Sequence, residues 1–399
     1  MLRYFTAGES HGPMLVGVLE GLPAGMLLAE EDLAPRLARR QGGYGRGRRM
    51  AIEGDQPAIV GGLWKGHTTG APVAILIENR SNKQWRTKTR RTEPRPGHAD
   101  LAGMLKYGFD DANPVIERAS ARETAMRTAI GSVACHLLEL VGVRLTAHVF
   151  ELGGVTAPPL PADAGPDILE ELRDASPVSC CDPSASELMV ARIDEARERG
   201  ESLGGRTELV VWNLPPGLGS YVQWDRRLDS RLGAAMLSIP SAKGVEIGDA
   251  LETSRGFGRD AQDVVARRGD AIARPTNRSG GLEGGVTNGS PLVVRVTHKP
   301  IPTQRRPLPT VDLDSGDEVP GRYVRSDTAV VPAAAVIAEA MAGLVLADAL
   351  LENFGSDRFR DISESLGRFR ADLPSWEQAP LGDRATPDRV SRAEGGDGQ

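Results

Sequence analysis

The feature that most constrains this chain is the apolar run VVPAAAVIAEAMAGLVLADALL, which occupies residues 330–351. The run is long enough to cross a membrane, but it is rich in alanine and contains Glu339 and Asp348. We therefore predict a helix buried inside a folded protein, and no contact with a membrane. The helix should begin near Pro332, because proline suits a first turn, and end near Gly355.

A second long helix is predicted after the sequence SARE at residues 120–123. This is a capping-box pattern, in which the serine caps the helix and the glutamate reaches back to the serine. Both long helices follow an Arg-x-polar turn, Arg118-Ala119-Ser120 in one case and Arg325-Ser326-Asp327 in the other. The free N–H groups at the start of a helix form a natural phosphate site. The repeated turn suggests an internal duplication with a site at the shared interface.

Shorter elements are predicted from periodicity and turn residues. Strands are expected within residues 1–20 and at 57–64, 72–78, 207–215 and 291–299, and helices at 29–41, 186–199 and 226–237. Because strands and helices do not alternate regularly, the pattern favours an α+β fold over a doubly wound parallel sheet. Residues 80–112 are polar and basic, which predicts a long functional loop.

We expect one catalytic domain over residues 1–376. Residues 151–184 are rich in proline, glycine and acidic side chains, and could be a surface subdomain or an insertion. Residues 377–399 are poor in apolar side chains, so we expect a disordered C-terminal tail.

Charge and cysteine usage restrict the class of protein. The formal net charge of -6 and the pI near 5.7 argue against a nucleic-acid partner. Cys135 falls within a predicted helix and Cys180 is adjacent to Cys181, which is not a disulfide framework. The start, MLRYFTAGESHG, has no apolar signal segment. We therefore expect a cytoplasmic protein in a reducing environment.

Common cofactor and metal motifs are missing from the sequence. There is no Walker sequence, no G-x-S-x-G elbow and no HExxH, so no metal is expected. Residues 256–261, GFGRDA, match the dinucleotide pattern G-x-G-x-x-A. No apolar strand precedes them and no long helix follows, which argues against a classical dinucleotide-binding fold.

Two of the six histidines lie in glycine-containing polar turns, His11 in AGESHGP and His98 in RPGHAD. Histidine readily holds or releases a proton near neutral pH, and glycine lets a ligand approach closely. Each could act as a general acid or base, or could be a turn histidine bonded to nearby backbone. The other four histidines fall in predicted strands or a helix and are expected to be structural.

Arginines are concentrated at one helix end and in the following loop GGYGRGRR; they are Arg36, Arg39, Arg40, Arg46, Arg48 and Arg49. They could form a solvated basic face or an RNA-binding loop. Guanidinium groups match carboxylate and phosphate geometry, and the chain as a whole is acidic. A polyanionic metabolite is therefore the favoured ligand.

Several short motifs occur in order between about residues 2 and 350. They are GESHG at 8–12, the arginine loop at 39–49, RPGHAD at 95–100, RASARETA at 118–125, KGVEIGD at 243–249, NRSGGLEGG at 277–285, TNG at 287–289, KPIPT at 299–303 and RSDTAVVPAAAV at 325–336. In this combination and order they resemble the chorismate synthase family.

The resemblance implies an anti 1,4-elimination of phosphate and a ring proton from 5-enolpyruvylshikimate 3-phosphate to give chorismate, the last common step of the shikimate pathway. It implies a requirement for reduced FMN, which donates charge transiently as phosphate leaves and takes the proton through N5. It also implies a β-α-β sandwich of antiparallel sheets and long helices, and a homotetramer. No reductase domain is recognisable, so a separate flavin reductase is expected, with NADPH as a candidate reductant.

Three catalytic residues follow from the same resemblance. His98 matches the histidine that protonates the departing phosphate, and His11 matches the one that manages the protonation of flavin N1. Asp327 matches the aspartate near flavin N5 that assists proton removal. The matching cofactor-binding positions are Arg118, Ala119, Ser120, Pro240, Ser241, Gly284, Lys299, Pro300, Ile301, Pro302, Thr303 and Arg325.

The basic loop supplies the remaining candidates. Arg40 and Arg46 match arginines that are assigned to the nicotinamide cofactor in the family, and Arg49 belongs to the same loop. We expect these arginines to meet the carboxylates or phosphate of the substrate, with NADPH as the alternative ligand.

The chain departs from the family pattern at two positions. Many members have Arg-Ser-Ser where this chain has Arg118-Ala119-Ser120, which removes one hydroxyl contact to flavin. Asn or Gln followed by Ala is usual where this chain has Pro240-Ser241, and proline lacks a backbone donor. Weaker flavin binding would follow if backbone N–H groups make those contacts.

Two rival functions remain open at this point. Another flavin-dependent oxidoreductase acting on an anionic metabolite would use similar loops, and it would tolerate loss of His98 better. A non-catalytic RNA-binding protein would use the arginine loop, and its binding would depend steeply on salt.

Overall fold

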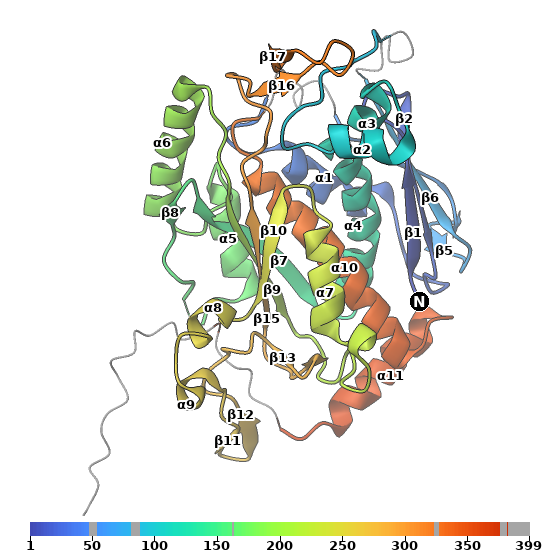
Figure 1. Cartoon of the computed structure of the whole chain (residues 1–399). Coiled ribbons are helices and arrows are strands. Elements are labelled where there is room, and N and C mark those ends of the chain that lie inside the picture. The colour runs from blue at the N-terminus through green and yellow to red at the C-terminus, as the bar shows by residue number, and fades with distance from the viewer. Residues whose placement is uncertain (48–53, 81–87, 162, 323–326, 376–380, 382–399) are drawn as a thin grey trace, which may run out of the picture.

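The computed structural model describes residues 1–47, 54–80, 88–161, 163–322, 327–375 and 381. Two antiparallel sheets enclose a layer of helices (Figure 1). The four-stranded sheet has the order β1-β2-β6-β3 and consists of β1 (Arg3–Ala7), β2 (Met14–Glu20), β6 (Val73–Glu78) and β3 (Pro57–Gly61). The five-stranded sheet has the order β10-β15-β9-β7-β8 and consists of β10 (Ala242–Ile247), β15 (Leu292–His298), β9 (Gly205–Trp212), β7 (Arg144–Leu152) and β8 (Val155–Thr156). The predicted α+β fold and the predicted sandwich are both confirmed.

The helix layer consists mainly of α4 (Thr124–Leu140) and α10 (Val331–Phe354), which pack against each other. The other helices are α1 (Ala34–Gln41), α2 (Asp100–Tyr107), α3 (Asn113–Arg118), α5 (Pro166–Ala175), α6 (Pro183–Arg199), α7 (Leu228–Leu237), α8 (Ala250–Thr253), α9 (Gly258–Ala261) and α11 (Phe359–Asp372), with short 3-10 turns η1 (Glu30–Asp32), η4 (Ala121–Glu123) and η5 (Trp224–Arg226). Small hairpins are β4–β5 (Leu63–Trp64, His67–Thr68), β11–β12 (Ala266–Arg268, Ala271–Ala273), β13–β14 (Leu282–Glu283, Val286–Thr287) and β16–β17 (Pro309–Val311, Glu318–Pro320).

Most predicted elements are present, but two predictions need correction. The segment 80–112 is not a continuous loop, because α2 forms from Asp100 and its Met104 is buried. The capping box is half formed: Ser120 accepts a hydrogen bond from the backbone of Arg122, while Glu123 turns to Thr6 and Arg127 instead. Met104 packs against Ala112 and Val115, and Glu123 bonds to Thr6, so packing overrode the local pattern in both cases. Domain limits at residue 376 stay a prediction, since 376–380 and 382–399 lie outside the described residues.

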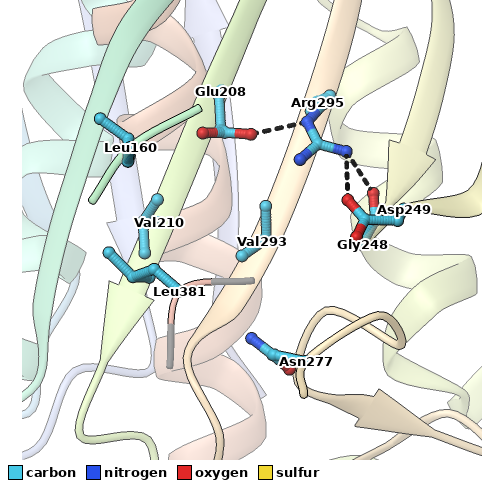
Figure 2. A pocket seen from close by; sticks show the side chains of 9 residues that line it. All are labelled: Leu160, Glu208, Val210, Gly248, Asp249, Asn277, Val293, Arg295 and Leu381. Carbon is cyan, nitrogen blue, oxygen red and sulfur yellow. Dashed lines mark hydrogen bonds and ion pairs between the residues drawn. The ribbon is translucent and has the colours of Figure 1, made fainter. Parts of the chain in front are cut away.

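Both faces of the five-stranded sheet are covered. Alternate residues of β9 point to opposite sides, so Leu209 and Val211 join the helix layer while Glu208 and Val210 face outward. The outward side contains a small cavity with a buried ion pair, in which Arg295 donates to Glu208 at 2.6 Å (Figure 2). Because none of the predicted site residues lines this cavity, we assign it to the structural core.

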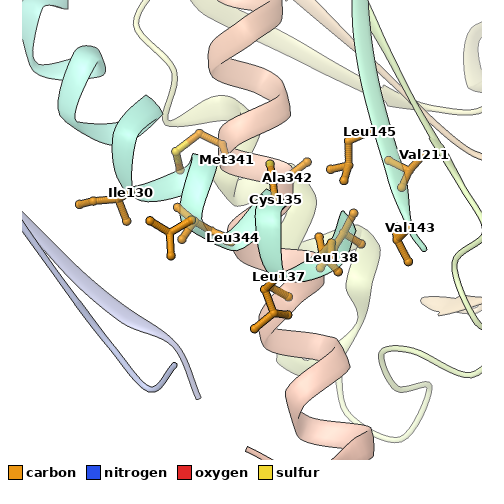
Figure 3. Packing of buried hydrophobic residues seen from close by; sticks show 14 of the residues in the cluster. Ile130, Cys135, Leu137, Leu138, Val143, Leu145, Val211, Met341, Ala342 and Leu344 are labelled. Carbon is orange, nitrogen blue, oxygen red and sulfur yellow. The ribbon is translucent and has the colours of Figure 1, made fainter. Parts of the chain in front are cut away.

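Buried side chains of α4 and α10, among them Cys135 and Met341, lie in one hydrophobic cluster (Figure 3). The close contact between the two helices depends on two glycines. A Cβ at Gly131 of α4 would lie 2.4 Å from the backbone oxygen of Ala340, and one at Gly343 of α10 would lie 2.4 Å from Sγ of Cys135. No side chain fits at such distances, so the two helices approach closely only because both positions are glycine. α4 packs on β2 and β6 and α10 on β7 and β9, which joins the two sheets into one core.

The apolar run at residues 330–351 forms α10, with Pro332 in its first turn and Gly355 directly after it, as predicted. Of the helices in the described residues, α10 is the one that is long and apolar enough to cross a membrane, judged by length and composition only. In the structure 89% of its most apolar 18-residue window is buried, and Glu339 has no exposed surface. Its apolar surface is therefore accounted for by packing inside the protein.

Candidate active site

Most of the predicted site residues lie at the end of the sandwich where α4 and α10 begin (Figure 1). The turn between β1 and β2 carries His11, and the short helix α3 ends beside it. The loop before α2 carries His98, and the segment after β15 carries Lys299. The site is therefore built from loops that the two sheets and the helix layer hold in place.

His11 is held by Glu117, a residue that the sequence analysis did not single out. The Glu117 carboxylate accepts a hydrogen bond from the backbone N–H of His11 at 2.8 Å, and its Oε1 lies 3.0 Å from Nδ1 of the ring. Lys88 Nζ lies 3.2 Å from the same Nδ1 and also pairs with Glu117. Burial favours a higher pKa for Glu117, but hydrogen bonds from His11 and Lys88 outweigh it and lower the pKa to about 2. Glu117 is therefore ionised at neutral pH.

The Arg118-Ala119-Ser120 turn connects α3 to η4 and lies against the β1–β2 turn. Arg118 donates to the backbone oxygen and the hydroxyl of Thr6, each at 2.9 Å. Ser120 donates to the Ser10 hydroxyl at 3.1 Å, which places this turn directly beside His11. Ala119 is the C-cap residue of α3. The structure thus brings the first predicted cofactor segment together with the first predicted catalytic histidine.

The predicted arginines of the basic loop are held by acidic residues. Arg40 is 3% exposed and binds Asp55, the Thr124 hydroxyl and the backbone of Ala121. Burial lowers the pKa of Arg40 to about 10, so it keeps its charge at neutral pH. Through its bonds to Ala121 and Thr124, Arg40 supports the backbone directly after the Ser120 turn. Asp55 was missed by the sequence analysis, since an isolated aspartate carries no local signal.

Arg46 and Asp327 contact each other across a large sequence separation. Arg46 pairs with the Asp327 carboxylate at 3.0 Å, and the backbone N–H of Gly47 donates to the same carboxylate at 2.6 Å. The basic loop therefore contacts the segment that leads into α10. Arg49 and Arg325 lie outside the described residues.

His98 lies among cations. Arg95 is bidentate to Asp100, with distances of 2.7 and 2.9 Å, which fixes the turn that carries His98. Burial lowers the pKa of His98 to about 4, and the charges of Arg95 and Lys299 add to that effect against the opposing Asp100. The buried Nε2 of His98 has no hydrogen-bond partner among the described residues. A buried polar atom without a hydrogen bond destabilises the protein unless a ligand or a water molecule supplies the missing partner.

The segment Lys299–Thr303 lies beside His98. Lys299 Nζ donates to the backbone oxygen of Gly97 at 2.8 Å, and a Cβ at Gly97 would lie 2.9 Å from Cβ of Pro302. On the other side, the Lys299 N–H donates to the backbone oxygen of Ser241 at 2.9 Å. Two predicted cofactor segments and one predicted catalytic histidine therefore meet at this point.

At Pro240-Ser241, where the chain differs from the family pattern, Ser241 contacts a buried histidine, His298. Ser241 adopts a left-handed backbone with φ of 76°, which is uncommon for a residue other than glycine. Its hydroxyl lies 3.3 Å from Nδ1 of His298, and Nε2 of His298 lies 3.3 Å from the Thr207 hydroxyl. His298 is 3% exposed, and burial lowers its pKa to about 4. The buried position of His298 agrees with the structural role expected for it, and its contact with Ser241 has no signal in the local sequence.

The two histidine regions are connected through a series of contacts between side chains of β1, η4 and the first turn of α4. Arg118 contacts Thr6, Thr6 donates to Glu123 at 2.6 Å, and Glu123 pairs with Arg127. Arg127 in turn donates to the backbone of Ser238 at 3.0 Å, two residues before Pro240. These contacts place the two regions at the same end of the molecule.

Among the predicted site residues that the structure describes, Gly284 lies apart from the others. It lies in the turn of the β13–β14 hairpin, toward the opposite end of the five-stranded sheet (Figure 1). Within the described residues, the atom nearest to a Cβ at Gly284 would be Cβ of Tyr221, at 3.9 Å. Sequence order alone could not reveal this separation.

Cations thus gather around two histidines at one end of the sandwich, an arrangement that suits a multiply anionic small molecule. The family model for chorismate synthase matches residues 2–351. Chorismate synthase from Thermobifida fusca is 47% identical, covering 94% of this chain and 99% of the relative, and that from Salinispora tropica is 50% identical, covering 90% and 95%. A crystal structure of chorismate synthase superposes with a TM-score of 0.77 at 38% identity, covering 92% of this chain and 97% of the other. The chain belongs to the chorismate synthase family, and is thus a carbon–oxygen lyase that acts on phosphates.

Proposed function

We propose that this enzyme converts 5-enolpyruvylshikimate 3-phosphate to chorismate and phosphate, with reduced FMN bound beside the substrate. The observation that carries the proposal is the buried, unpartnered Nε2 of His98 close to the cations of Arg95 and Lys299. A phosphate group would supply the missing acceptor and offset the positive charge. The reaction breaks one C–O and one C–H bond and forms one C=C bond, so it has no net redox change.

The described residues fit anionic ligands. The half-exposed Arg118 lies beside the His11 turn, and Lys88 and Lys299 approach the same end of the sandwich. Substrate and FMN together bring two carboxylates and two phosphates, and such groups need several cations. Reduced FMN, when bound, would supply electron density as the phosphate leaves and would accept the ring proton. We propose that the Ser120 turn, Pro240-Ser241 and Lys299–Thr303 hold it.

The three catalytic residues would act at separate atoms. His98 would donate a proton from Nε2 to the departing phosphate, which makes that group a better leaving group. His11 would accept or hold a proton next to the flavin ring. Asp327 would assist removal of the ring proton, and its contacts with Arg46 and Gly47 fix the orientation of its carboxylate.

The test is an anaerobic assay with 5-enolpyruvylshikimate 3-phosphate and chemically reduced FMN, following chorismate absorbance and phosphate release. Equal amounts of chorismate and phosphate, with no product from oxidised FMN, would support the proposal. His98→Ala should reduce kcat by about 10² to 10⁴, the range for loss of one general acid. The matched control is His67→Ala, because His67 is exposed on β5 and contacts the backbone of Lys65.

Absence of turnover in a protein that binds FMN would refute the lyase reaction and favour the oxidoreductase alternative. Addition of NADPH under the same conditions asks whether the chain reduces its own flavin. We propose that it does not, and that a separate reductase supplies reduced FMN. If NADPH alone sustains turnover, this part of the proposal is wrong.

We also propose a cytoplasmic homotetramer. The face of the four-stranded sheet that points away from α4 is apolar, with Phe5 and Val60 of β1 and β3 being 75% and 59% exposed. A sheet that is apolar on both faces is usually covered on both. All three cysteines are free and buried, which suits a reducing compartment. Sedimentation equilibrium tests the assembly, and Phe5→Lys should favour smaller species.

A further inference from the structure

We infer that Glu117 is the positioning residue for His11: it keeps the ring proton on Nδ1 and leaves Nε2 as the nitrogen that exchanges protons in the site. The inference deepens the proposed function, since the catalytic use of His11 rests on that proposal. The arrangement of His11, Glu117 and Lys88 is a property of the protein alone, and it can be tested without substrate or flavin.

The Glu117 carboxylate holds His11 at two points. Its Oε2 accepts from the backbone N–H of His11 at 2.8 Å, and Nδ1 of the ring lies 3.0 Å from Oε1 and 3.2 Å from Oε2. The backbone oxygen of Glu117 also accepts from the N–H of Ser10 at 3.1 Å. The Glu117 side chain is 5% exposed while that of His11 is 33% exposed. One buried residue therefore locates both the backbone and the ring of a more exposed histidine.

The chemistry of the neighbours decides where the ring proton lies. Nδ1 has two candidate partners: the Glu117 carboxylate, which can only accept, and the Lys88 ammonium, which can only donate. Lys88 already donates to Oε1 of Glu117. An unprotonated Nδ1 would place its lone pair 3.0 Å from an ionised carboxylate, which is repulsive. The favourable state has Nδ1–H donating to Glu117 and Lys88 sharing the same carboxylate, so Nε2 is the basic nitrogen.

Helix α3 explains how Glu117 reaches this position. The helix has Pro114 in its first turn and ends after two residues that point toward the β1–β2 turn. Glu117 reaches His11, and the adjacent Arg118 reaches Thr6. A short rigid helix thus carries the group that orients His11 and the neighbouring predicted cofactor residue together.

The first measurement is the long-range ¹H–¹⁵N spectrum of ligand-free protein labelled at histidine, recorded across a pH series. A His11→Asn variant assigns the signals of His11. We expect the neutral ring of His11 to carry its proton on Nδ1. A neutral ring with its proton on Nε2 would overturn the inference, and this outcome needs no variant of Glu117 to fold.

The second measurement compares Glu117→Met with Lys88→Met, two variants that introduce the same side chain. In Glu117→Met the carboxylate is lost and Lys88 can donate to Nδ1, so the proton should move to Nε2. In Lys88→Met the carboxylate remains, so the proton should stay on Nδ1. Circular dichroism checks that each variant is folded. An unchanged tautomer in folded Glu117→Met, or the same change in both variants, would overturn the inference.

The kinetic consequence is tested separately in the chorismate assay. Glu117→Met should lower kcat on the order of 10² to 10⁴, with a smaller effect on KM, because orientation of His11 matters most in the reacting complex. A loss confined to KM would assign Glu117 to ligand binding instead and overturn its positioning role. If the wild-type enzyme makes no chorismate, the proposed function fails while the tautomer result still stands, so the two failures are distinguishable.

Discussion

Arg39 and Glu339, 300 positions apart, form a bidentate ion pair inside the helix layer, with nitrogen–oxygen distances of 2.9 and 2.8 Å. The Glu339 carboxylate also accepts from the backbone N–H of Ala147 at 2.7 Å and lies 3.5 Å from both Arg36 and Arg173. Although burial acts against ionisation, these cations lower the pKa of Glu339. The charged residue within the most apolar helix therefore connects α10 to α1 and β7.

Replacement of Glu339 by leucine should destabilise the protein. The variant leaves three arginines near a buried site without their common partner, and the expected loss is about 3–5 kcal/mol in the free energy of unfolding. Denaturant unfolding measures it. Glu364→Leu is the control, since Glu364 is exposed on α11 and should change stability by less than about 0.5 kcal/mol. Equal effects in both variants would contradict a structural role of the buried pair.

Gly131→Ala should also lower stability, because its Cβ would collide with the backbone of α10. Gly367→Ala on α11 is the matched control, as nothing described lies within 4 Å of a Cβ there. Alanine is the better helix former, so the control should be stabilised by up to about 1 kcal/mol. Opposite signs in thermal unfolding are expected. A stabilised Gly131→Ala would show that the two helices can separate without cost.

Anion binding should be coupled to proton uptake at His98. Its pKa of about 4 means that the ring is neutral at pH 7 in the ligand-free protein. A bound dianion favours the charged form of the ring and raises that pKa, so a proton enters with the ligand. Calorimetric titration with sulfate at about pH 6, in buffers of different ionisation enthalpy, measures the number of protons taken up on binding. His98→Asn should abolish it, and zero uptake by the wild type would refute the coupling.

Stability should decrease as pH falls from about 6.5 toward 4, in part because of His298. The unfolded chain binds a proton near the ordinary pKa of 6.5, while the folded ring stays neutral down to about 4. Unfolding therefore takes up protons in this window, and acid favours the unfolded state, by up to about 3 kcal/mol. His298→Gln should reduce the slope of the unfolding free energy against pH. An unchanged slope would assign the acid sensitivity to other groups.

Much of this protein could be predicted from local sequence. The α10 helix follows from a long apolar run with proline at its start and glycine after its end. The Ser120 cap precedes η4, which leads directly into the predicted α4 helix, and the apolar residues of PLVVRVTHK form the predicted strand β15. His11 and His98 could be selected as candidates because each lies in a polar, glycine-containing turn. These features depend on neighbours within a few residues, which is why the sequence alone was sufficient.

Contacts between distant residues were decided only by the tertiary structure. The carboxylates of Glu117 and Asp55 carry no local signal, and no local pattern indicates a partner for Glu339. Each of the three holds an arginine, a lysine or a histidine that comes from another element. The fold also separated Gly284 from the other described site residues. The sequence by itself determined the family, the elements and the candidate histidines. Their partners, charge states and orientation depend on which side chains the packed sheets and helices bring within hydrogen-bond distance, because electrostatic interactions act through space rather than along the chain.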